Sequence, residues 1–149
     1  MSDGERKHLL TDFRRPVRVG DRIAVYGEYL STFDQVHGAM EMRGKVRLEG
    51  ACWLQGVLYK LGNTAGFVPE RKGQVVGELY EILDPSAIAW VDRQIEDDCA
   101  RSDYTFERKL VHVIEPETEA WAYVWGPDEI RNGRAIPTGD WRGHTGNLR

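Results

Sequence analysis

The sequence predicts a single α+β domain whose sheet is strongly curved or closed into a small barrel. Six or seven segments have the apolar, β-branched composition of strands, and one acidic helix interrupts them, so helices and strands do not alternate as in a doubly wound sheet. Gly56 and Gly77 lie inside strand-like segments, where glycine permits tight bending. We therefore expect a mixed barrel of about six strands with flanking helices.

The length and charge of the chain restrict its organisation and its partners. The 149 residues suit one domain, and we expect residues 1–21 to be a polar N-terminal extension and residues 22–149 to be the domain, ending in a loop-rich tail. No apolar run approaches a membrane span, and the N-terminus lacks the apolar core of a secretory signal, so we expect a cytoplasmic protein with no membrane partner. The net charge of −4 and the scattered basic residues argue against nucleic acid as a partner.

Metal and cofactor chemistry finds no support in the sequence. The four histidines and two cysteines have no metal-ligand spacing, and no glycine-rich phosphate loop follows a strand. We therefore expect no metal, nucleotide or other cofactor. Cys52, which lies beside Trp53 in a strand-like segment, is expected to be a small buried hydrophobe.

Glycines and polar segments mark the ends, bulges and turns of the expected strands. Gly27 ends the first strand, Gly56 predicts a bulge in the second, residues 70–73 predict a polar turn, and residues 115–118 predict a hairpin turn between the last two. The expected strands cover residues 22–26, 50–60, 67–69, 74–82, 106–114 and 119–125.

The helix has a well-defined start. Asp84 can cap the free N–H groups, and Pro85 at the first helical position loses nothing by lacking a donor. The helix should run to about residue 97 or 98. Asp92 and Glu96, four residues apart, share one face. The apolar stripe of this helix is Ile88, Val91 and Ile95.

Seven short motifs occur in an order that resembles the gamma-glutamylcyclotransferase-like superfamily, which includes the avirulence-induced-gene-like proteins. The resemblance covers about residues 23–141 and implies a small mixed barrel with flanking helices, in agreement with the strand pattern. The motifs are Tyr26-Gly27-Glu28-Tyr29-Leu30, Gly56-Val57-Leu58-Tyr59, Val76-Gly77-Glu78-Leu79-Tyr80, Val91-Asp92-Arg93-Gln94-Ile95-Glu96-Asp97, Phe106-Glu107-Arg108, Ala120-Trp121-Ala122-Tyr123-Val124 and Gly139-Asp140-Trp141.

The resemblance implies an intramolecular acyl transfer on a small gamma-glutamyl amine or peptide. The α-amine of the gamma-glutamyl group attacks its own γ-amide carbonyl, which releases 5-oxoproline and a free amine. One carboxylate suffices, because it can accept the proton of the attacking amine and return it to the leaving nitrogen. The alternative is a non-catalytic small-molecule-binding or accessory protein of the same fold. Either is expected as a monomer or a homodimer.

Glu96 is the catalytic carboxylate that the resemblance implies. The alternative is that Glu96 belongs to a solvated acidic face, and Asp92 and Asp97 are the fallback candidates for the carboxylate. Two features depart from the family pattern. Glu28 replaces a small Ser or Thr, and Glu96 lies four residues after Asp92 where the family places its Glu three residues after the Asp.

The substrate-binding residues that the resemblance implies surround the first strand end. Backbone N–H groups there would face the substrate, which is why Gly27 matters. Tyr26 either lines the pocket mouth or packs in the core, Tyr123 either contacts ligand or packs across strands, and Arg108 either orients an acidic ligand or pairs with Glu107 or Asp140. We expect a pocket between the loop after Tyr26 and the helix that starts at Pro85. The implied binding residues are Tyr26, Gly27, Glu28, Tyr29, Leu30 and Tyr123.

Overall fold

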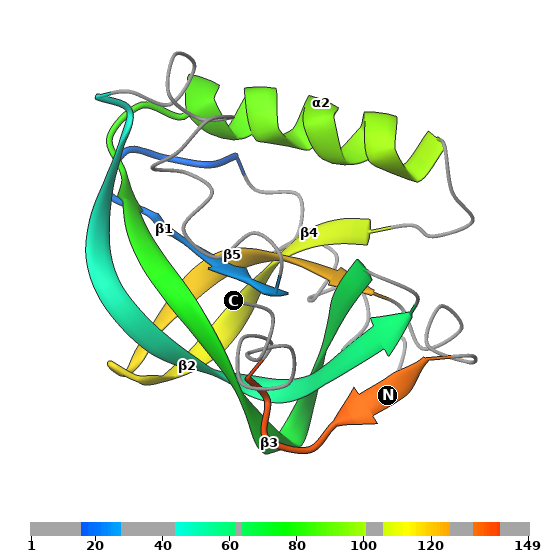
Figure 1. The fold of residues 1–149 in the computed structure, drawn as a ribbon. Coiled ribbons are helices and arrows are strands. Elements are labelled where there is room, and N and C mark those ends of the chain that lie inside the picture. The colour runs from blue at the N-terminus through cyan, green and yellow to red at the C-terminus, as the bar shows by residue number, and fades with distance from the viewer. Residues whose placement is uncertain (1–15, 28–43, 62–63, 101–105, 126–132, 141–149) are drawn as a thin grey trace, which may run out of the picture.

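The computed structural model describes residues 16–27, 44–61, 64–100, 106–125 and 133–140 (Figure 1). In the part of the chain so described there are six strands and one helix. The elements are β1 (Arg22–Tyr26), β2 (Val46–Leu61), β3 (Thr64–Ile82), α2 (Ser86–Ala100), β4 (Phe106–Glu115), β5 (Thr118–Trp125) and β6 (Arg134–Ile136). β3 joins the strands expected at residues 67–69 and 74–82, and β6 lies in the tail that was expected to be loop-rich.

Five of the strands close into a barrel. The sheet order is β3-β1-β5-β4-β2-β6, and an additional pairing of β2 with β3 joins the two ends of the five-stranded part. β1 runs parallel to β5, with Ile23 opposite Trp121, whereas the other pairings are antiparallel. β6 lies outside the barrel, against β2. The predicted small mixed barrel of about six strands is therefore confirmed.

The two longest strands bend at Gly56. Their register shifts between Gln55 and Gly56, because Gln55 faces Gln74 while Gly56 faces Pro69. Gly56 has φ 152°, and an added Cβ would lie 2.4 Å from the carbonyl oxygen of Val68. The predicted bulge is confirmed. The polar turn expected at residues 70–73 is wrong, because this segment bulges out of a continuous β3 as the paired strands bend.

Two apolar cores lie on opposite faces of the barrel wall. Side chains alternate along β1, so that Ala24 and Tyr26 belong to the core inside the barrel, while Ile23 and Val25 belong to a second core beneath α2. In Figure 1 α2 lies across the barrel on the side of β1 and β4. The second core is completed from the helix by Ala87, Ile88, Val91 and Ile95.

The helix begins as predicted and ends a little later. Oδ1 of Asp84 accepts a 3.0 Å hydrogen bond from the Ser86 N–H, and this bond lowers the pKa of Asp84. α2 continues to Ala100, two or three residues past its expected end. Within the described residues, no helix is long and apolar enough to cross a membrane.

Candidate functional site

Tyr26 ties the end of β1 to two neighbouring strands. Its hydroxyl donates a 2.6 Å hydrogen bond to the carbonyl oxygen of Tyr123 on β5 and accepts a 3.1 Å bond from the Phe67 N–H on β3. Its ring packs against Phe67 with a centroid separation of 5.6 Å, and only 4% of the residue is exposed. Tyr26 is therefore packed in the core, which is one of the two roles expected for it.

Position 27, directly after β1, accepts only glycine. Gly27 has φ 64°, and an added Cβ would lie 2.4 Å from Cβ of Ala65. The backbone therefore passes very close to β3 as it leaves the barrel wall. Glu28, Tyr29 and Leu30, also expected to bind substrate, lie outside the described residues.

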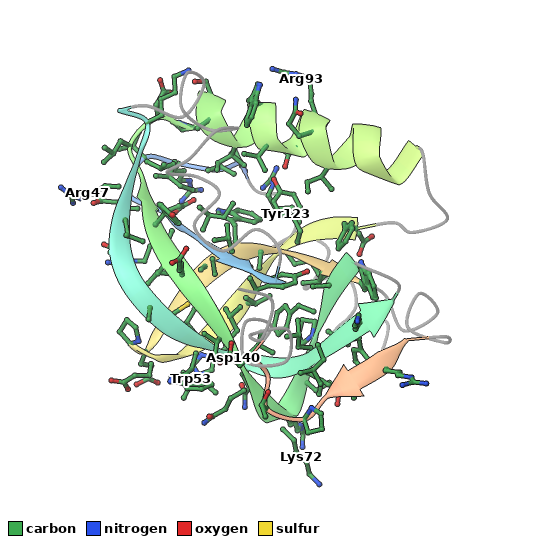
Figure 2. All side chains as sticks on the ribbon, in the orientation of Figure 1. Arg47, Trp53, Lys72, Arg93, Tyr123 and Asp140 are labelled. Carbon is green, nitrogen blue, oxygen red and sulfur yellow. The ribbon has the colours of Figure 1, made fainter. Side chains whose placement is uncertain are left out.

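Asp92 is the carboxylate that joins α2 to the barrel. Its Oδ1 accepts a 2.5 Å hydrogen bond from the Tyr123 hydroxyl and a 3.0 Å bond from Nε of Arg108, and its Oδ2 accepts a 3.0 Å bond from Nη2 of Arg108. Figure 2 shows Tyr123 on the side of the barrel that faces α2. The paired bonds from a planar guanidinium to both oxygens give this contact a defined geometry.

Arg108 forms an ion pair, but with a different partner from those predicted. In the structure its partner is Asp92, and neither Glu107 nor Asp140 pairs with it. Side chains alternate along β4, so Glu107 points to the opposite face and lies 3.3 Å from Nζ of Lys109. The guanidinium of Arg108 also lies 4.7 Å from the ring centroid of Trp121.

An apolar cavity opens where the two cores meet, between the end of β1 and α2. It has a volume of about 20 Å³, which is room for roughly one water molecule. Tyr26 and Tyr123, two of the predicted binding residues, share this cavity with two side chains of α2. Its described walls are Ala24, Val25, Tyr26, Val91, Ile95, Phe106 and Tyr123.

Two of the candidates for the catalytic carboxylate, Glu96 and Asp97, lie beyond Asp92 on α2. Glu96 and Asp97 lie on the helix, but their side chains fall outside the described part. Ile95 stands three residues after Asp92, where the family pattern has its Glu, and this side chain lines the cavity with 5% of the residue exposed. By that spacing, an aliphatic side chain stands where the resemblance implies a carboxylate.

Sequence reasoning named two of the seven described residues that line the cavity and missed the other five. Val91, Ile95 and Phe106 have the spacing of ordinary core residues, and no local signal marks them as lining a cavity. The nearness of Arg108 to Tyr123 could not be counted from the turn, because a two-residue turn at residues 116–117 would place Arg108 opposite Trp125. In the structure Val113 faces Thr118, and Arg108 therefore faces Tyr123. The position of Asp92 near that pair could not be counted either.

The fold and the site together define a class of protein. It is a small closed mixed barrel with a helix over its wall and a cavity at the end of the first strand. The sequence profile of the family described as gamma-glutamyl cyclotransferase, AIG2-like, matches residues 23–143. The chain belongs to this family.

Individual relatives agree with the assignment. A protein of Halalkalibacterium halodurans named "Putative gamma-glutamylcyclotransferase" is 33% identical over 108 residues, which cover 71% of this chain and 96% of the relative. The solution structure of the Escherichia coli protein ytfP is similar with a TM-score of 0.59 at 27% identity, over 83% of this chain and 98% of that one.

More distant solved structures share the fold alone. The crystal structure of an aig2-like protein from Mus musculus has a TM-score of 0.56 at 17% identity, over 83% of this chain and 88% of that one. An uncharacterised protein from Pyrococcus horikoshii has a TM-score of 0.60 at 21% identity, over 86% of this chain and 95% of that one.

Proposed function

We propose that this protein is a gamma-glutamylcyclotransferase-like enzyme that releases 5-oxoproline and a free amine from a gamma-glutamyl amine or peptide. The observation that carries the proposal is the convergence of three parts of the family pattern on one cavity. The end of β1 with Tyr26, the β5 residue Tyr123 and the acidic helix α2 meet there. Membership of the family supports the general reaction class.

The reaction asks little of the protein because the reacting groups belong to one molecule. The α-amine nitrogen bonds to the γ-carbonyl carbon, the bond from that carbon to the amide nitrogen breaks, and one proton passes from the attacking to the leaving nitrogen. Folding the substrate into a ring-closing shape supplies much of the rate increase. The remaining need is a carboxylate that carries the proton. Backbone N–H groups after Tyr26 would stabilise the developing oxyanion.

Glu96 is the carboxylate that we propose for the proton transfer. Its backbone lies one helical turn beyond Asp92 on the same face of α2. Asp92 is less suited to this role, because both of its oxygens already accept hydrogen bonds from Arg108 and Tyr123. We assign Asp92 to holding the helix and Glu96 to moving the proton.

Release of free 5-oxoproline from a panel of gamma-glutamyl amines and dipeptides tests the activity. Glu96→Gln should lower kcat by at least about 10²-fold, since general acid–base catalysis is typically worth 10²–10⁴-fold. Glu107→Gln, which replaces an exposed carboxylate on β4, is the matched control and should leave kcat unchanged. Full activity in Glu96→Gln together with a loss in Asp97→Asn would move the role to Asp97.

A second candidate function is non-catalytic binding of a small gamma-glutamyl compound. The observation in its favour is Ile95, which places an aliphatic side chain in the cavity where the family pattern has its Glu. Heat of binding measured by calorimetry, with no 5-oxoproline formed by the parent protein, would support this function over the enzymatic one.

A further inference from the structure

Glu78 stands beside the end of β1, on the face of the sheet that carries the cavity. In the antiparallel pairing of β1 with β3, Val25 lies opposite Glu78 and Tyr26 lies opposite Gly77. Partners across two strands send their side chains to the same face, and Val25 is a wall of the cavity. Glu78 is therefore the neighbour of that wall on the β3 side, and it is only partly buried.

Gly77 brings this part of β3 very close to β1. An added Cβ at Gly77 would lie 2.8 Å from the carbonyl oxygen of Val25 and 3.3 Å from Sγ of Cys52. The close approach of the two strands accounts for the glycine, but it does not require a carboxylate at the next position. Glutamate is mostly exposed in folded proteins, and partial burial of its charge costs free energy, so the choice of Glu78 calls for a functional reason.

The carboxylate on the other side of the cavity is already engaged. Both oxygens of Asp92 accept hydrogen bonds, from the Tyr123 hydroxyl and from the guanidinium of Arg108. Asp92 and Arg108 form an ion pair, so their charges largely offset each other. Glu78 adds a negative charge on the opposite side of Val25, at the point where the chain leaves β1 through Gly27.

We infer that Glu78 binds the α-ammonium group of the gamma-glutamyl substrate. The inference rests on the proposed function and specifies how the substrate is held: its α-nitrogen lies on the β3 side of the end of β1. The charge-assisted bond orients the nitrogen on binding, and the proton transfer stays with Glu96. A carboxylate has two oxygens with about four acceptor positions, so Glu78 can hold the ammonium together with contacts inside the protein.

The test uses two ligands that cannot cyclise and that differ only in the α-ammonium group. S-propyl-L-homocysteine has a thioether sulfur where the substrate has its γ-carbonyl carbon, and 4-(propylsulfanyl)butanoic acid is the same molecule without the amine. By calorimetry, the parent protein should bind the first at least about 10-fold more tightly, the usual size of a hydrogen bond between charged groups. Glu78→Gln should lower this ratio of dissociation constants by a similar factor.

Glu81→Gln is the matched control. Glu81 lies three residues further along β3, on the opposite face, and its carboxylate pairs with Arg47. This substitution removes the same charge from the same strand, so it should leave the ratio unchanged. Glu78→Asp keeps the charge and withdraws it by one methylene, and the ratio should fall there too, which provides the comparison if Glu78→Gln does not fold.

The outcomes separate this role from the enzymatic function. An unchanged ratio in the Glu78 variants, an equal fall in Glu81→Gln, or no binding of either ligand by the parent would overturn the role of Glu78. The release of 5-oxoproline is measured separately on gamma-glutamyl amides. If the parent releases none, the enzymatic function fails, and a ratio that falls only in the Glu78 variants still supports Glu78 as the ammonium-binding residue of a binding protein.

Discussion

The Tyr123 hydroxyl donates a 2.5 Å hydrogen bond to Oδ1 of Asp92, and this bond connects the barrel wall to the helix above it. The same tyrosine accepts a hydrogen bond from the Tyr26 hydroxyl through its main-chain carbonyl. Tyr123 therefore links β1, β5 and α2, and it also lines the cavity. A change at any of these three residues should alter the geometry of the cavity as well as the stability of the fold.

Asp92→Asn should destabilise the protein by about 1.5–3 kcal/mol, the usual contribution of hydrogen bonds to charged groups. The substitution removes the negative charge that Arg108 holds through two nitrogen atoms. Urea unfolding followed by circular dichroism measures the change. Glu107→Gln, which breaks a mostly exposed contact with Lys109, should stay within about 0.5 kcal/mol of the parent. Equal effects of the two substitutions would contradict the role given to Asp92.

Tyr26→Phe should cost about 1–3 kcal/mol, because it leaves the Phe67 N–H and the Tyr123 carbonyl without their hydroxyl partner. The ring and its packing against Phe67 remain, so the loss reports the hydroxyl alone. Tyr59→Phe is the control, since in the described part of the chain the Tyr59 hydroxyl makes no hydrogen bond to another residue. Thermal unfolding of the parent protein and the two variants measures the change in stability. If Tyr26→Phe loses no more stability than Tyr59→Phe, the two hydrogen bonds of the Tyr26 hydroxyl do not stabilise the fold.

Gly27→Ala should be strongly destabilising, by more than about 2 kcal/mol, because it combines a left-handed backbone with a Cβ that overlaps Ala65. Gly20→Ala separates the two causes, since Gly20 has φ 93° but has no atom within 4 Å of an added Cβ. The double change Gly27→Ala with Ala65→Gly should recover part of the loss in urea unfolding. Failure to recover would mean that the backbone conformation, and not the contact, dominates.

Cys52 should be chemically inert in the folded protein. Burial raises the pKa of its thiol to about 12, with a smaller contribution from the charge of Glu78. In a Cys99→Ser background, the native protein should not react with a thiol reagent at pH 8, whereas denatured protein should react fully. Rapid reaction of the native protein would contradict the burial of Cys52.

The same shift has a consequence for stability at high pH. The folded pKa lies above the ordinary value of 9.0, so the protonated thiol favours the folded state. This contribution is complete below pH 9 and is lost as the pH rises toward 12. The free energy of unfolding of the parent should therefore fall relative to that of Cys52→Ala across this range, and a constant difference would contradict it.

Features that depend on neighbours in sequence could be predicted. The β-branched runs, the bulge at Gly56, the start of α2 after Asp84 and the turn at residues 116–117 each follow from local backbone preferences, and the structure confirms them. The parallel pairing of β1 with β5 and the ion pair of Asp92 with Arg108 depend on where distant segments lie, and no spacing rule gives them. The conformation of residues 70–73 could not be predicted either, because a polar, glycine-containing segment suits a turn and a bulge equally.

The parallel contact of β1 with β5 governs when the protein can fold during its synthesis. β1 lies between β3 and β5, and β5 ends at Trp125, so the barrel cannot close until the chain has been translated beyond that residue. Until then one edge of β1 has no partner, and the apolar residues Ile23 and Val25 lack the Trp121 side of their core. Contacts so distant in sequence make folding slow and leave such an edge open to pairing with other chains. The nascent chain is therefore most vulnerable to aggregation just before β5 leaves the ribosome.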